Sequence, residues 1–229
     1  IYNIYGFGTG NAGSRFSFFI RDILAKEKVD YRSLILNTER NTAFLQYKGM
    51  SVDLGGIGKG AAADAVMGGL LDRIADDGPI EISGVMIDMG GNVLVRGNNG
   101  VKPEWRIGVR DPGSGPSSFC GILEIEEGAV STSGVYERSR IRGKKTVHHI
   151  MDPRTRQPAQ TGLLSVTVSA PTAMIADGLS TAAFILGTEK GAALIESHNE
   201  TGGVFITKNG DFYCAGSAKE RFRWCRPTV

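Results

Sequence analysis

The spacing of apolar residues along this chain predicts four helices. In each of four stretches, apolar side chains recur every three or four residues, which places them on one face of an α-helix. The last two stretches each end in glycine, a common helix stop. The four predicted helices cover residues 16–27, about 60–76, 172–187 and 188–202.

A second pattern, of short apolar runs between turn residues, predicts strands. Residues 32–37 and 42–49 read as a pair of strands with a polar turn between them, and 203–216 as a hairpin turning at Asn209-Gly210. Residues 81–97 read as two strands around Gly90-Gly91-Asn92. Further strand segments are 104–112, 121–134, the first part of 146–158, and 163–171.

The order of these elements predicts one mixed domain. No repeat and no linker divides residues 1–229, and long antiparallel segments alternate with helices. The expected fold class is therefore α+β, a single domain with a mainly antiparallel sheet, in which residues 217–229 form a C-terminal tail.

Composition narrows the class of protein. Of the 229 residues, 41% are hydrophobic and 22% charged, as in ordinary globular proteins. The net charge of +2 argues against nucleic-acid binding as the main activity. No run of 18 apolar residues occurs, so no membrane span is expected. The three cysteines form no metal-binding spacing.

A glycine-rich loop, DLGGIGKG at residues 53–60, leads into the second predicted helix. It is not a P-loop, because Asp53 stands at the first glycine position and Gly60 follows Lys59 in place of Ser or Thr. Glycines and a helix N-terminus still favour a phosphate near residues 55–60, although a plain turn into a helix has the same pattern. The string GTGNAG at 8–13 matches a dinucleotide fingerprint, but no acidic residue closes the next strand.

Asp177 and Thr181 stand four residues apart in a predicted helix with largely apolar flanks. This spacing places a carboxylate and a hydroxyl on one helix face, a pair of hard oxygen donors that suits Mg²⁺. A solvated Asp beside a Thr that bonds back to its own helix would give the same spacing. Burial would require a partner for the carboxylate, and a metal ion is one such partner.

Two further stretches carry polar candidates. His148 and His149 follow each other on a predicted strand, so at most one of them points into a site, where it could orient a substrate or transfer a proton. The STSG stretch at 131–134 supplies hydroxyls beside a glycine turn. Each stretch by itself is equally compatible with a structural role.

Six motifs in order resemble the ApbE family, the FAD:protein FMN transferases. The resemblance runs from Ile1 to about Gly216. The motifs are YGFG (5–8), DLGGIGKGAAAD (53–64), DMGGNVLVRG (88–97), VSTSGVYER (130–138), HHIMDPRTRQP (148–158) and SVTVSAPTAMIADGLSTAAFILG (165–187).

The resemblance implies an ApbE-like, T-fold-like α/β domain that binds FAD and Mg²⁺. It implies cleavage of FAD to AMP and attachment of FMN, through a phosphoester, to a Thr or Ser of a carrier protein such as a redox-complex subunit. The implied metal ligands are the carbonyl of Gly56 and the side chains of Asp177 and Thr181. Asp53, Lys59, Ser133, His149 and Ile150 would contact or line the flavin nucleotide site.

The catalytic residues implied are Lys59, His149 and Asp177. Lys59 and Mg²⁺ would neutralise charge on the pyrophosphate, and either His149 or Asp177 would take the proton of the acceptor hydroxyl. Two alternatives remain open, an FAD pyrophosphatase that uses water as the acceptor and a flavin-binding module without catalysis.

The resemblance also carries expectations about location and about departures from the family pattern. Bacterial members are mostly exported lipoproteins, so the cell envelope is the expected location. Family members carry a segment before YGFG that this sequence does not include. Gly56 and Gly58 stand where one or two alanines are usual, an exchange expected to be harmless, and Arg156 stands where glycine is usual.

Overall fold

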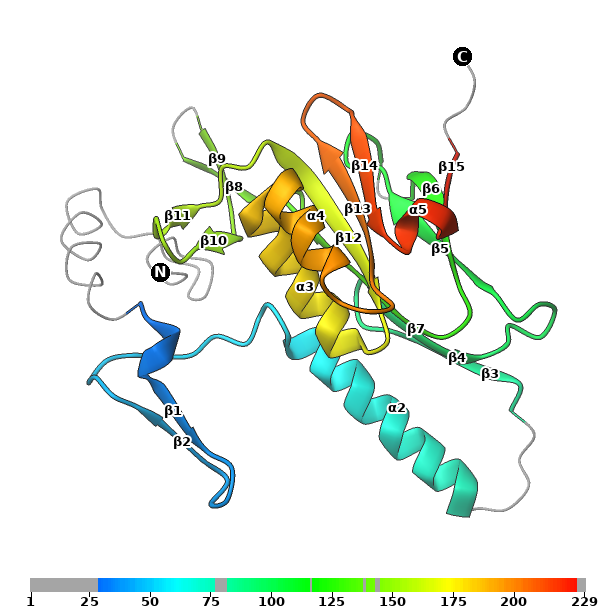
Figure 1. Ribbon diagram of the computed structural model, residues 1–229, viewed down its shortest axis with the longest axis horizontal. Helices are drawn as coiled ribbons and strands as arrows, with labels where there is room; N and C mark the ends of the chain where they lie inside the picture. Colours follow the sequence, from blue (N-terminus) through cyan, green and yellow to red (C-terminus); the bar gives the residue numbers. More distant parts are fainter. Residues whose placement is uncertain (1–28, 77–81, 116, 138, 143–144, 226–229) are drawn as a thin grey trace. The chain divides into compact units, whose positions relative to one another are not determined.

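The computed structural model describes residues 29–76, 82–115, 117–137, 139–142 and 145–225 (Figure 1). Contacts divide the chain into two units, Ile1–Leu54 with Arg138–Ala159, and Gly55–Glu137 with Gln160–Val229. The expectation of one domain stays a prediction. The predicted helix at 16–27 and the GTGNAG string lie outside the described residues.

The second unit is built on a six-stranded antiparallel sheet, in the order β14-β13-β12-β7-β4-β3. This confirms the expected α+β class with mainly antiparallel pairing. Its strands are β3 (Gly84–Asp88), β4 (Asn92–Gly97), β7 (Gly128–Gly134), β12 (Leu163–Ala170), β13 (Gly202–Thr207) and β14 (Phe212–Gly216). The predicted hairpin at 203–216 is confirmed, with Gly210 at a φ of 85° in its turn.

A three-stranded antiparallel sheet, in the order β15-β6-β5, packs against one face of the larger sheet. Its strands are β5 (Trp105–Arg110), β6 (Phe119–Ile125) and β15 (Phe222–Trp224). The core between the two sheets holds Val95, Val130 and Val204 from the six-stranded sheet and Leu123 and Phe222 from the smaller one. Sheets of alternating apolar pattern bury their inner faces in this way.

Three helices cover the other face of the six-stranded sheet (Figure 1). They are α2 (Gly58–Asp76), α3 (Ala173–Leu186) and α4 (Thr188–Glu196). The core under α2 and α3 consists largely of small residues: Ala63, Ala129, Ala170, Ala173 and Ala176, with Met67 and Leu94. Small side chains let the two helices and the sheet approach closely.

Some expected boundaries differ in the structure. The stretch 121–134 is not one strand: β6 ends at Ile125 and β7 begins at Gly128, whose φ of 113° is a turn conformation open to glycine. α4 ends at Glu196 instead of reaching Gly202, and near its end the carbonyl of Ile195 accepts the Thr201 hydroxyl at 2.7 Å.

The described part of the expected C-terminal tail, residues 217–225, also differs from the expectation. It contains the helix α5 (Ala218–Arg221) and the strand β15. Ala218 and Phe222 are buried in the core between the sheets, and Phe212 stacks on Trp224 with ring centroids 4.2 Å apart. The segment therefore belongs to the core as far as Trp224.

The first unit, in its described part, contains short hairpins. The predicted strand pair is confirmed as β1 (Leu34–Asn37) and β2 (Thr42–Leu45), preceded by the 3-10 turn η3 (Tyr31–Ser33). The others are β8 (Ser139–Arg142) with β9 (Lys145–His148), and β10 (Met151–Asp152) with β11 (Gln157–Pro158). Arg156 has a φ of 59°, in the left-handed region that glycine adopts without strain. The turn therefore has a backbone conformation that suits the glycine expected at this position in the family.

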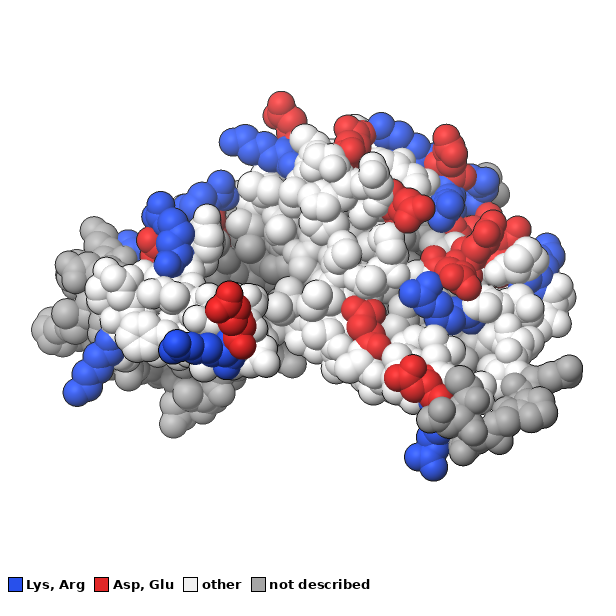
Figure 2. All heavy atoms as spheres, turned by 60° about the horizontal axis from the view of Figure 1, so that its bottom comes forward, with Lys and Arg blue, Asp and Glu red and all other residues white. Residues whose placement is uncertain are grey.

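On the face drawn in Figure 2, Lys and Arg side chains lie among Asp and Glu side chains. Among the described residues, no helix combines the length and hydropathy that crossing a bilayer requires.

One carboxylate ties α2 to α3. Asp64 of α2 accepts the backbone N–H groups of Ala173 and Met174 at 2.8 and 2.9 Å, in the first turn of α3. Thr172 adds the N-cap bond to the N–H of Ile175. A negative charge at a helix N-terminus is also favoured by the helix dipole.

We expect Asp64→Ala to lower the free energy of unfolding by about 1–2 kcal/mol, because two amides of α3 lose their acceptor. Urea denaturation measures the change. Asp72→Ala, which removes an exposed carboxylate from the same helix, is the control and should stay within about 0.5 kcal/mol of the parent. Equal effects of the two substitutions would contradict the capping role.

Tyr136, just after β7, has a phenol whose pKa is raised. Burial raises the pKa of its phenol to about 12, with a smaller contribution from the nearby Glu137 carboxylate. The guanidinium of Arg110 lies over its ring, 4.4 Å from the centroid.

The shift predicts a loss of stability in alkali. The folded-state pKa of Tyr136 lies above the unfolded value of about 10, so the native state binds this proton more tightly. Its contribution to the free energy of unfolding is complete below pH ~10 and is lost as the pH rises toward 12. Urea denaturation of the parent and of Tyr136→Phe between pH 9 and 12 measures this. Parallel pH profiles of the two chains would contradict it.

Candidate functional site

The strand β7 presents two serines to α3. Ser131 and Ser133 lie two residues apart, so their side chains share one face of the sheet. On α3, Asp177 and Thr181 lie four residues apart and share one helix face. Two strand residues span about 6.6 Å and four helix residues about 6 Å, so the two pairs can meet in register.

Asp177 is buried, with 2% of its surface exposed, and both of its oxygens have neighbours. Oδ2 accepts the backbone N–H of Gly60 at 3.0 Å. Oδ1 lies 3.4 Å from the hydroxyl of Ser131 and 3.7 Å from the Nζ of Lys59. Ser131 also lies 2.6 Å from Oδ1 of the buried Asn92. Partners within the protein therefore offset part of the cost of burying this carboxylate, and Oδ1 is the less tightly held oxygen.

Thr181 stands beside a second buried hydroxyl cluster. Its Oγ1 lies 3.1 Å from the hydroxyl of Ser133, which in turn lies 2.8 Å from the hydroxyl of Ser180. Ser180 donates to the backbone carbonyl of Asp177 at 2.9 Å. A Cβ built on Gly56 would lie 3.7 Å from Thr181 Oγ1, which places the backbone at residue 56 next to this hydroxyl.

The surroundings of Gly56 show whether the alanine expected in the family would fit at residue 56. That Cβ would meet Thr181 Cγ2 at 3.6 Å, which is an ordinary van der Waals contact. An alanine therefore fits at residue 56, in keeping with the expectation that the exchange is harmless there.

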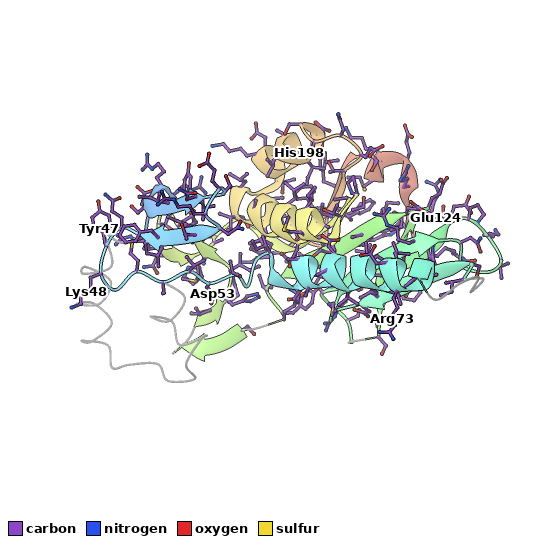
Figure 3. The ribbon with its side chains drawn as sticks, turned by 90° about the horizontal axis from the view of Figure 1, so that it is seen from below. Tyr47, Lys48, Asp53, Arg73, Glu124 and His198 are labelled. Carbon is purple, nitrogen blue, oxygen red and sulfur yellow. The ribbon has the colours of Figure 1, made fainter. Side chains whose placement is uncertain are left out.

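The N-terminus of α2 brings residues 56–60 of the glycine-rich loop to this cluster. Figure 3 shows α2 along its length, with Asp53 on the segment that leads into it and Arg73 near its other end. The side chain of Lys59, in the first turn of α2, is 40% exposed, so its ammonium group is accessible to a ligand. A helix N-terminus and a lysine together favour an anion.

Five of the sequence-predicted residues therefore meet within one unit: Gly56, Lys59, Ser133, Asp177 and Thr181. The other three, Asp53, His149 and Ile150, belong to the first unit. There His148 is buried, with Nε2 3.0 Å from the carbonyl oxygen of Ala159, which is a structural role for one histidine of the pair. His149 is half-buried. The roles of Asp53, His149 and Ile150 stay predictions.

An ion pair shapes the turn after the histidines. Arg154 donates to both carboxylate oxygens of Asp152 at 2.9 Å, and this hydrogen bonding lowers the pKa of Asp152. Asp152 is therefore charged at neutral pH and contributes to the turn at Pro153.

The donor set suits a hard divalent cation. Within the described ranges, no three His, Cys, Asp or Glu side chains gather closely enough to hold a metal ion by themselves. Asp177 Oδ1, Thr181 Oγ1 and the carbonyl of Gly56 are all oxygens, and only one of them is charged. Mg²⁺ commonly binds one or two carboxylates and completes its shell with water and phosphate oxygens, so these residues fit it.

Comparison with known proteins identifies the family. The ApbE family model matches residues 1–206. FAD:protein FMN transferases of Klebsiella pneumoniae and Treponema pallidum are each 35% identical to this chain, over 191 and 174 residues, or 83% and 72% of it. These matches cover 56% and 46% of the two relatives, so the chain spans about half of their length. The chain belongs to the ApbE family.

Solved structures agree with this assignment. The ApbE protein of Thermotoga maritima superposes with a TM-score of 0.79 at 30% identity, covering 96% of this chain and 69% of that one. The flavin transferase ApbE of Vibrio cholerae superposes with a TM-score of 0.71 at 28% identity, covering 95% and 67%. The expected ApbE-like fold is therefore confirmed.

Sequence reasoning did not single out four residues of the cluster, Gly60, Asn92, Ser131 and Ser180, although Gly60 lies in the glycine-rich loop and Ser131 in the STSG stretch. Ser131 could have been found, because it lies two residues from Ser133 and so shares its strand face. Ser180 gave no signal, since a serine beside Thr181 in a helix is unremarkable in sequence. Asn92 was recognised only as a turn residue.

Proposed function

We propose that this chain transfers FMN from FAD to a Thr or Ser hydroxyl of a carrier protein and releases AMP, in a reaction that depends on Mg²⁺. The observation that carries the proposal is the meeting of Asp177, Thr181, Gly56 and Lys59 at the N-terminus of α2. Relatives that match most of this chain are named FAD:protein FMN transferases, which supports it.

The proposed metal ligands are the side chains of Asp177 and Thr181 and the carbonyl of Gly56. Bound there, Mg²⁺ would neutralise charge on pyrophosphate oxygens. Asp177 needs a fixed orientation for this role, and its bond from Gly60 N–H supplies one. A Cβ at residue 56 would lie 3.7 Å from Thr181 Oγ1, so the backbone there lies beside this hydroxyl.

Lys59 has two proposed roles. Its ammonium group lies 3.7 Å from Asp177 Oδ1 and is partly exposed, so it balances the buried carboxylate and can also contact a phosphate oxygen of FAD. A positive group held there stabilises charge that develops as the pyrophosphate bond breaks. The dipole of α2 adds to the same effect.

The acceptor hydroxyl must lose a proton when its phosphoester forms. Asp177 and His149 are the two candidate acceptors for this proton. Because Oδ2 of Asp177 already accepts the Gly60 N–H and Oδ1 is a proposed metal ligand, we assign the role to His149. Asp53 and Ile150 are proposed to contact the flavin nucleotide, and Ser133 is proposed to line the site beside Thr181.

The test is incubation with FAD and Mg²⁺, with and without a carrier that bears a flavinylation site. Chromatography follows AMP and intact mass follows the carrier. AMP together with an FMN-sized mass gain supports the transferase. AMP without labelling of the carrier indicates the pyrophosphatase, and bound FAD without either product indicates a binding module.

A further inference from the structure

The hydroxyl cluster beside Thr181 has a defined direction of hydrogen bonding. A carbonyl oxygen can only accept, so the proton of Ser180 is committed to the carbonyl of Asp177, 2.9 Å away. Each hydroxyl has one proton. The Ser180 oxygen must therefore act as acceptor in its 2.8 Å contact with Ser133.

The same assignment of hydroxyl protons applies to Thr181. Because Ser133 donates its proton to Ser180, its oxygen must accept in the 3.1 Å contact with Thr181. The proton of Thr181 then points back toward β7. The lone pairs of Thr181 Oγ1 are left to face away from Ser133, which is the orientation that a cation ligand requires.

We propose that Ser180 and Ser133 are positioning residues that orient the hydroxyl of Thr181 as a Mg²⁺ ligand. This rests on the proposed function, which places Mg²⁺ on Thr181 and Asp177. Ser180 is fully buried and Ser133 is 8% exposed, so water does not readily replace either hydroxyl. Hydrogen bonds from residues behind a ligand commonly set its orientation and its affinity for the metal.

The test is calorimetric titration of Mg²⁺ into the FAD-saturated chain. Ser180→Ala removes the acceptor of the Ser133 hydroxyl, so the Ser133 proton can turn toward Thr181. The Thr181 proton would then turn toward the metal. Ser133→Ala removes the acceptor of Thr181 itself. We expect each variant to bind Mg²⁺ about 10- to 100-fold more weakly. In AMP release, the Mg²⁺ concentration for half-maximal rate should rise by a similar factor, with a smaller change at saturating Mg²⁺.

A double variant separates this role from general loss of packing. If Ser180 acts only through Ser133, then Ser133→Ala with Ser180→Ala should bind Mg²⁺ no more weakly than Ser133→Ala alone. Ser169→Ala is the matched control, because it removes another buried serine hydroxyl, from β12, and should leave Mg²⁺ affinity unchanged.

The outcomes are distinguishable. Affinities of the two single variants within twofold of the parent would overturn the positioning role and leave the proposed function standing. Fully additive losses in the double variant would also overturn it. A parent chain that binds FAD but has no measurable affinity for Mg²⁺ would overturn the metal-dependent function and this inference together.

Discussion

Asp177→Asn is expected to reduce Mg²⁺-dependent release of AMP from FAD by about 10³-fold while the chain stays folded. The substitution is isosteric and removes the charge that a cation needs. The amide oxygen of Asn can still accept the N–H of Gly60, so the contact between α2 and α3 is retained. Lys59 loses its partner at Oδ1, but its side chain reaches solvent and stays hydrated.

The measurement is the rate of AMP release at several Mg²⁺ concentrations, with the Mg²⁺ affinity determined in parallel by calorimetry. Asp72→Asn makes the same chemical change on the exposed side of α2 and should leave both quantities unchanged. Near-ultraviolet circular dichroism checks that Asp177→Asn is folded. A rate within tenfold of the parent would exclude Asp177 as a metal ligand.

Gly60→Ala should have the largest effect on stability, lowering the free energy of unfolding by about 3 kcal/mol. A Cβ at this position would lie 2.2 Å from the carbonyl oxygen of Ala173 and 2.7 Å from the Cα of Met174. Both are backbone atoms, so no side-chain rotation relieves the clash. The helices α2 and α3 would have to separate, which also weakens the bond from Gly60 N–H to Asp177.

The same helix supplies a control of opposite sign. Gly68 is exposed in the middle of α2, and a Cβ there would meet nothing within 4 Å. Gly68→Ala should therefore raise the free energy of unfolding by about 0.5–1 kcal/mol, because alanine loses less backbone entropy in a helix. Urea denaturation of the two variants measures both. A destabilised Gly68→Ala, or an unaffected Gly60→Ala, would contradict the packing argument.

The roles of glycine in the loop at 53–60 show where sequence reasoning reached its limit. The sequence suggested that these glycines let a phosphate approach the backbone. At Gly60 the close neighbour is the start of α3, and its N–H is already bonded to Asp177. A glycine that packs against a helix and a glycine that faces a ligand look the same in the sequence. The difference lies in the neighbouring atoms in space, and the residues next to the glycine in the chain do not reveal these.

For Asp177, too, the sequence predicted some features and left others open. Its spacing from Thr181 and its apolar flanks predicted a shared helix face and burial, and both are observed. The partners of its carboxylate could not be foreseen, since Gly60 lies 117 residues away and Ser131 46 residues away in the chain. The roles of Asp53, His149 and Ile150, and the expected location in the cell envelope, stay predictions.

The sequence by itself determined what depends on near neighbours. Periodic apolar residues set the helices and strands, the Asn209-Gly210 turn set a hairpin, and four-residue spacing set the pairing of Asp177 with Thr181 on one face. The order of six motifs determined the family. Only the tertiary structure decided the contacts across α2, α3 and β7. Three features depend on how closely these elements pack: the cap from Asp64, the close approach at Gly60, and the hydroxyl chain from Thr181 to Ser180. That packing is determined by residues that are distant from one another in the sequence.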